Sequence, residues 1–161
     1  MWREMINLWQ SVRDPEYAHL LLESLPLYGL AASLIFLAVS FFTREAKSRL
    51  LALTLIAVCS GSVWPYVTLR EKAQPRIVAT HDPSYGPLIR EQTKRRTSTG
   101  WAYYSLAMIS TITLILVAAG KGRGFVALTT VAAVGCFWLS LWLHKKECEI
   151  YHRNIVKYRP P

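Results

Sequence analysis

Long apolar stretches alternate with short polar segments along this chain. The stretch from Leu25 to Phe42 carries no charge over about 18 residues, which is enough for a helix to cross the hydrocarbon core of a bilayer. Three further stretches share this character. We predict membrane-spanning helices at about 15–43, 48–71, 99–119 and 124–144. The predicted fold class is therefore all-α, a four-transmembrane-helix bundle in one integral membrane domain covering residues 1–161.

The polar segments predict the remaining elements. Residues 1–13 alternate with helical periodicity and place two tryptophans on the apolar face, which is typical of an amphipathic helix lying in the membrane interface. A helix packed on protein would show the same pattern. Residues 73–98 contain three prolines and are predicted to form a long polar loop. Residues 145–161 are predicted to form a polar tail.

The first span begins before its apolar stretch does. Asp14 is a suitable N-cap and Pro15 a suitable first helical residue, so a helix from there to Phe42 would be roughly 42 Å long. This length exceeds the hydrocarbon core, and the first two turns should therefore stand among the lipid headgroups. Pro26 should kink the helix close to these turns.

Aromatic residues are distributed unequally between the two sides of the predicted bundle. With four spans, both termini and residues 73–98 lie on one side, and the tryptophans all lie toward it. An aromatic belt ordinarily marks both membrane interfaces. We therefore expect this side to contact other membrane protein subunits. The predicted interface residues are Trp2, Trp9, Trp64, Trp101, Trp138 and Trp142.

The formal net charge is +9, with 19 Lys and Arg against 10 Asp and Glu. The basic residues flank the apolar stretches, which favours anionic lipid headgroups as partners and argues against nucleic acid. Orientation is ambiguous, because the total count of basic residues favours a cytoplasmic terminal side and the short basic turns favour the opposite.

Cys59 and Cys136 lie within apolar stretches, and no C-x-x-C-H site for c-type haem is present.

Histidines are the main candidates for cofactor chemistry. His19 begins the first span and His144 ends the fourth, so both could stand at similar depth and ligate a b-type haem or a transition metal. Glu23 lies four residues after His19 and could act as an outer ligand partner or a proton-relay carboxylate. The alternatives are interfacial histidines and a carboxylate that reaches water. No metal site is assigned, because the histidines and cysteines do not occur at the sequence spacings typical of metal ligands. No catalytic residue is assigned.

Residues 19–26 resemble the opening signature H-P-x-x-V-H-F-P of a bacterial family of small four-helix membrane proteins known only as a domain of unknown function. The stretch 147–156 resembles that family's closing G-x-L-V-Y-x-x-G-x-x-V motif. Ser24 replaces the second histidine of the opening signature, Leu20 replaces its first proline, and the closing glycines are absent. Family members sometimes accompany c-type cytochrome domains, which implies a redox setting.

We therefore expect a non-enzymatic accessory or structural subunit of a larger membrane complex in the bacterial cytoplasmic (inner) membrane, in an energy-transducing or redox setting. Its partners would be the lipid bilayer and other membrane protein subunits, with no nucleic acid. The first alternative is a small electron-transfer protein binding a b-type haem or a metal. The second is a component of a transporter or channel.

Overall fold

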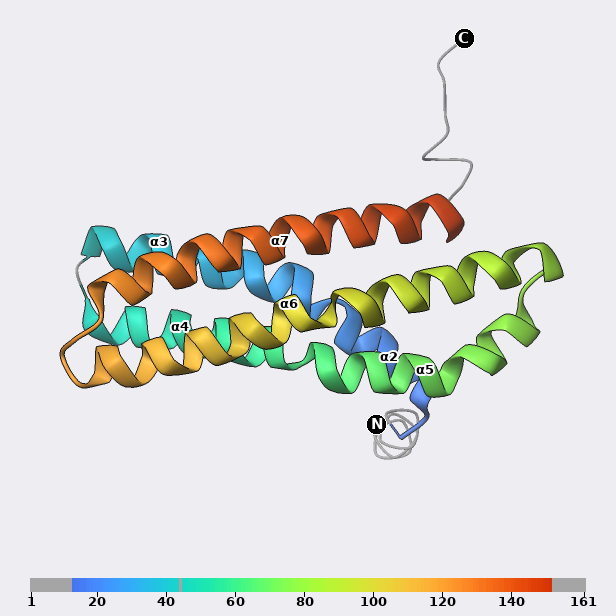
Figure 1. Ribbon diagram of the computed structural model, residues 1–161, viewed down its shortest axis with the longest axis horizontal. Helices are drawn as coiled ribbons and strands as arrows, with labels where there is room; N and C mark the ends of the chain where they lie inside the picture. The colour runs from blue at the N-terminus through green and yellow to red at the C-terminus, as the bar shows by residue number, and fades with distance from the viewer. Residues whose placement is uncertain (1–12, 44, 152–161) are drawn as a thin grey trace, which may run out of the picture.

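The computed structural model describes residues 13–43 and 45–151, and all regular structure in these ranges is helical. Four antiparallel helical rods lie side by side, with their short-turn ends aligned at one end of the molecule (Figure 1). Each rod is long and apolar enough to span a membrane. The predicted four-helix architecture is confirmed at this level. The predicted interfacial helix at 1–13 lies outside the described residues except for its last position.

The first rod consists of α2 (Pro15–Glu23), the π-helical η1 (Leu25–Gly29) and α3 (Leu30–Thr43). Asp14 caps the rod, since its side chain accepts a hydrogen bond from the Glu16 N–H at 2.9 Å. At Pro26, where a kink is predicted, the structure has a π turn. Proline has no N–H to donate to the preceding turn, and the wider turn accommodates this loss.

The second rod combines α4 (Ala46–Gly61) with α5 (Val63–Thr80). The third and fourth rods are single helices, α6 (Gly86–Ala118) and α7 (Arg123–Tyr151). Between α6 and α7 the chain turns through Gly120 and Gly122, whose φ angles of 74° and 96° favour glycine. α4 packs against α3 and α6, α2 packs along α5, and α7 packs along α6.

The prediction of a long polar loop at 73–98 is wrong. α5 continues to Thr80, a short 3-10 helix η2 (Pro83–Tyr85) follows, and α6 begins at Gly86. Pro83 and Pro87 lie in the first turns of η2 and α6, where the missing N–H has no consequence. Pro75 lies inside α5 on its exposed face, where water can satisfy the carbonyl group that loses its partner. The predicted tail is also helical as far as Tyr151, and the rest of it lies outside the described residues.

The rods are longer than a bilayer core. α6 has 33 residues and is therefore about 50 Å long, against about 30 Å of hydrocarbon. Trp64, Trp101 and Trp138 all lie roughly 23 to 27 Å from the short-turn ends of their rods, and their side chains are 69%, 69% and 67% exposed. This common level, called here the tryptophan level, separates an apolar half of the bundle from a polar half. We call the polar half, beyond the tryptophans, the polar extension.

Among the other predicted interface residues, Trp142 is 44% exposed, and Trp2 and Trp9 lie outside the described residues. In the apolar half, Leu30, Ile56 and Leu106 are buried between the rods. Gly29 allows η1 to approach α4 closely, because a Cβ atom at this position would lie 2.4 Å from the sulfur of Cys59.

Candidate functional site

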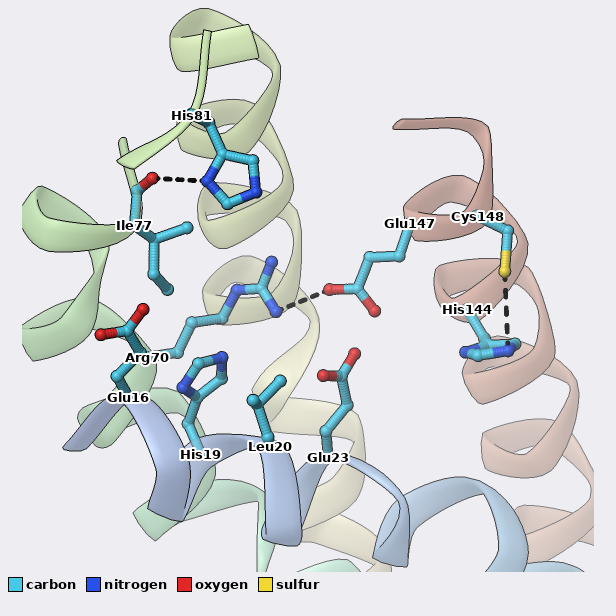
Figure 2. A pocket seen from close by; sticks show the side chains of 10 residues that line it. All are labelled: Glu16, His19, Leu20, Glu23, Arg70, Ile77, His81, His144, Glu147 and Cys148. Carbon is cyan, nitrogen blue, oxygen red and sulfur yellow. Dashed lines mark hydrogen bonds and ion pairs between the residues drawn. The ribbon is translucent and has the colours of Figure 1, made fainter. Parts of the chain in front are cut away.

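A cavity of about 380 Å³ lies in the polar extension, where the polar end of α7 stands away from α2 and α5 (Figures 1 and 2). Its volume falls in the range of small-molecule sites. Its wall contains three histidines, three glutamates, an arginine and a cysteine, with two apolar side chains among them. The lining residues are Glu16, His19, Leu20, Glu23, Arg70, Ile77, His81, His144, Glu147 and Cys148.

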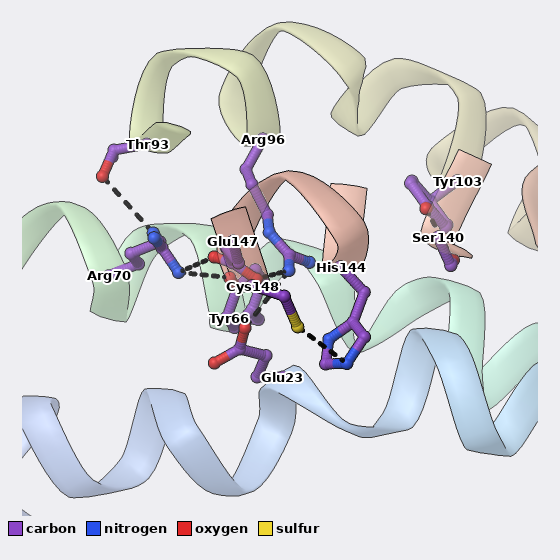
Figure 3. Close-up of polar contacts among 10 residues, drawn as sticks. All are labelled: Glu23, Tyr66, Arg70, Thr93, Arg96, Tyr103, Ser140, His144, Glu147 and Cys148. Atoms are coloured by element: carbon purple, nitrogen blue, oxygen red, sulfur yellow. Dashed lines mark hydrogen bonds and ion pairs between the residues drawn. The ribbon is translucent and has the colours of Figure 1, made fainter. Parts of the chain in front are cut away.

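Glu147 of α7 is the centre of a buried ion-pair network at this cavity (Figure 3). Its Oε1 atom lies 2.6 Å from Nη1 of Arg70, and its Oε2 atom accepts a hydrogen bond from Nη2 of Arg96. The three side chains are only 4% to 8% exposed. Since Arg70 belongs to α5 and Arg96 to α6, this one carboxylate connects three of the four rods.

Arg70 uses its remaining donors to fix its own orientation. Its Nη1 atom donates to the Tyr66 hydroxyl at 2.8 Å, and its Nε atom donates to Oγ1 of Thr93 at 3.3 Å. The aromatic ring of Tyr66 lies under Arg96, whose guanidinium carbon is 5.2 Å from the ring centroid. The guanidinium groups are therefore held by hydrogen bonds and aromatic contact as well as by charge.

Glu23 brings the first rod into the same network. Its Oε1 atom accepts a hydrogen bond from Nη2 of Arg96 at 3.2 Å, the same nitrogen that donates to Glu147. The Glu23 side chain is 23% exposed and lines the cavity. Glu23 contacts Arg96, and its role as an outer partner of His19 or as a proton-relay carboxylate stays a prediction. Both carboxyl groups thus contact Arg96, and Glu147 also contacts Arg70, which reduces the penalty of burying the guanidinium groups.

The predicted cofactor ligands lie on different walls of the cavity. His19 projects from α2, and its Nδ1 atom lies 3.2 Å from the Pro15 carbonyl oxygen, to which it donates. His144 projects from α7, with its Nε2 atom 3.6 Å from the Cys148 sulfur. The structure therefore brings both histidines to one cavity, as Figure 2 shows. Within residues 13–43 and 45–151, no group of three or more His, Cys, Asp or Glu side chains is placed to hold a metal ion.

A smaller polar cluster lies closer to the tryptophan level. The Ser140 hydroxyl of α7 lies within hydrogen-bond distance of the Cys136 carbonyl oxygen at 2.9 Å, the Pro26 carbonyl oxygen at 3.1 Å and the Tyr103 hydroxyl of α6 at 2.7 Å. Ser140 is fully buried, and Figure 3 shows it facing Tyr103. It thus supplies a partner for the backbone at the π turn of the first rod.

Sequence reasoning missed Arg70, Arg96 and Glu147, which form most of the network. Arg96 lies in the segment predicted to be a loop, and Glu147 lies in the predicted polar tail. A signal was present, because the buried residues of α6 recur at helical spacing through the supposed loop. These residues are Ile89, Thr93, Arg96, Gly100 and Tyr103.

Comparisons of the chain with family models, with curated proteins and with solved structures each gave no match. The assignment of a role to this cavity thus depends on its geometry.

Proposed function

We propose that this multi-pass protein is an accessory subunit of a larger complex in the bacterial cytoplasmic membrane. The observation that carries this proposal is the group of exposed tryptophans at the tryptophan level. Trp64, Trp101 and Trp138 come from three different rods and are each about two-thirds exposed. Tryptophan is enriched both at membrane interfaces and at the centres of protein–protein contacts.

The ion-pair network supports a structural role for the polar extension. Each guanidinium group contacts a carboxylate, and the four side chains hold the four rods together beyond the tryptophan level. A rigid extension of this kind can present a defined surface to a partner subunit. The energy-transducing or redox setting of that complex is proposed from the sequence resemblance.

Site-specific photocrosslinking in native membranes tests the proposal. A benzophenone side chain placed at Trp101 should form adducts with specific proteins, seen as discrete higher-mass bands that mass spectrometry can identify. The matched control is Ile112, which lies on the same helix, is 48% exposed, and is closer to the short-turn end. It should give few protein adducts. Native electrophoresis in mild detergent should place the chain in the same large complex.

Two results would contradict the proposal. One is migration of the chain as a free small protein in every mild detergent that keeps other membrane complexes intact. The other is the formation of protein adducts in equal yield at Trp101 and Ile112.

A b-type haem protein is the second candidate, favoured by the position of His19 and His144 on one cavity. Hydrogen bonding of Nδ1 to the Pro15 carbonyl leaves Nε2 of His19 as the unprotonated nitrogen, which is the arrangement that suits a metal-bound histidine. Absorbance spectra of the gently solubilised protein, oxidised and then reduced, test this candidate. A Soret band should disappear in His19→Ala and His144→Ala and persist in His81→Ala. Folded protein supplied with haem that shows no Soret band would exclude it.

A further inference from the structure

His144 and Cys148 form a close pair on the cavity wall. They lie four residues apart on α7, so they share one face of the helix, and both line the cavity. The Nε2 atom of His144 and the sulfur of Cys148 are 3.6 Å apart, and the cysteine is a free thiol that is partly exposed. Figures 2 and 3 show the two side chains pointing toward each other.

The separation of these atoms matches that of two ligands on one tetrahedral metal ion. Zinc binds cysteine sulfur at about 2.3 Å and histidine nitrogen at about 2.0 to 2.1 Å, so a tetrahedral angle between these bonds places sulfur and nitrogen about 3.5 Å apart. The observed distance is 3.6 Å. An ion could therefore bridge the pair with little adjustment of the side chains and none of the helix.

We propose that His144 and Cys148 chelate a thiophilic d10 metal ion, Zn²⁺ or Cu⁺. Thiolate and imidazole are the donors that these ions prefer. The Cys148 thiol releases its proton to solvent as the sulfur coordinates, and the neutral imidazole coordinates through Nε2. The site is independent of the proposed role as an accessory subunit.

The remaining coordination positions would be open to the cavity. Within the described residues, no third histidine, cysteine or carboxylate completes a ligand set, so water or a small molecule in the cavity fills these positions. A site with two protein ligands and an open face suits an ion that enters and leaves, rather than a permanent structural ion. Glu147, which lies between the two ligands in sequence, is already paired with both arginines and remains in the ion-pair network.

Cobalt substitution tests the site in the purified, reduced full-length protein in detergent. Co²⁺ should produce a thiolate-to-cobalt charge-transfer band, and Zn²⁺ should remove it by displacement. Cys148→Ser should abolish the band, and both Cys148→Ser and His144→Gln should weaken Zn²⁺ binding by at least tenfold. Cys59→Ser is the matched control, because this buried cysteine does not line the cavity, and the band should persist. Competition between the protein and a Cu⁺ chelator shows which of the two ions binds more tightly.

Far-UV circular dichroism confirms that each variant is folded before binding is measured. His19→Ala should leave Zn²⁺ affinity unchanged, which separates this site from the haem candidate that needs His19. The proposal is overturned if the wild-type protein shows no thiolate band with Co²⁺. It is equally overturned if folded Cys148→Ser binds Zn²⁺ as tightly as the wild type does, since the metal would then be held elsewhere.

Discussion

Replacing Glu147 by glutamine should destabilise the bundle far more than an ordinary loss of charge. The side chain is 5% exposed, and its Oε1 atom forms an ion pair with Arg70 at 2.6 Å. Glutamine keeps the volume and one acceptor oxygen, but it removes the negative charge shared by two guanidinium groups. Arg70 keeps its hydrogen bonds to Tyr66 and Thr93 but loses the charge of Glu147, whereas Arg96 retains Glu23.

The magnitude follows from the burial of these groups. Removing one partner of a buried ion pair costs about 3 to 5 kcal/mol, because the remaining charge stays out of water. Since Arg96 retains one carboxylate and glutamine retains one acceptor, we expect the lower end, a loss of about 3 kcal/mol in the free energy of unfolding. Titration with sodium dodecyl sulfate in mixed micelles, followed by far-UV circular dichroism, measures this quantity on the full chain.

Glu149→Gln is the matched control, two residues further along α7. Glu149 forms an ion pair with Lys146 at 2.7 Å, and both side chains are about one-third exposed. Solvent screens such a pair, so its loss should cost less than about 1 kcal/mol. If Glu147→Gln and Glu149→Gln lose the same free energy, the buried network does not hold the polar extension together and the reasoning fails.

Three further predictions concern the first rod and its contacts. Gly29→Ala should lower the free energy of unfolding by about 1 to 3 kcal/mol, because its Cβ would overlap the Cys59 sulfur, and adding Cys59→Ala should recover most of the loss in the same titration. Ser140→Ala should cost about 1 to 3 kcal/mol, because the buried Tyr103 hydroxyl and the Pro26 carbonyl both lose this polar neighbour, whereas an equal stability to wild type would refute that role. The hydrogen bond from the Glu16 N–H, aided by Arg76, lowers the pKa of the Asp14 carboxyl. The ionised Asp14 carboxyl therefore contributes fully to stability above its pKa in the unfolded chain, and this contribution is lost as the pH falls through its pKa in the folded chain. In Asp14→Asn, the melting temperature should therefore fall less steeply at acidic pH than it does in the wild type.

The apolar part of the bundle could be predicted because hydrophobic length and lack of charge are local properties of the chain. Leu25 to Phe42, for example, indicates a span without reference to any other segment. The polar half could not be predicted in the same way. The first turns of α6, for example, contain no long apolar run. A proline there indicates a loop as readily as a helix start, because the position of the preceding turn is not known from the sequence.

The ion-pair network could not be predicted for a related reason. His19, Glu23 and His144 adjoin apolar stretches and are therefore visible in the sequence, but Arg96 and Glu147 lie in segments predicted to be a loop and a tail. Arg96 and Glu147 are 51 residues apart and meet only because both helices continue beyond the tryptophan level. Long-range pairing of this kind cannot be inferred until the lengths and alignment of the rods are known.

The ion-pair network and the proposed metal site are connected by the geometry of α7. His144, Glu147 and Cys148 lie within one and a quarter turns of this helix, so fixing Glu147 against Arg70 and Arg96 sets the direction in which its neighbours project. Arg70 and Glu147 line the same cavity as His144 and Cys148. Ligand side chains whose directions are fixed by neighbouring contacts, and which face a cavity, are expected at a site that binds and releases a metal ion. Glu147→Gln should therefore weaken Zn²⁺ binding without abolishing it, whereas Glu149→Gln should leave binding unchanged. If metal binding in Glu147→Gln equals that of the wild type, the network stabilises the fold but does not position the chelating pair.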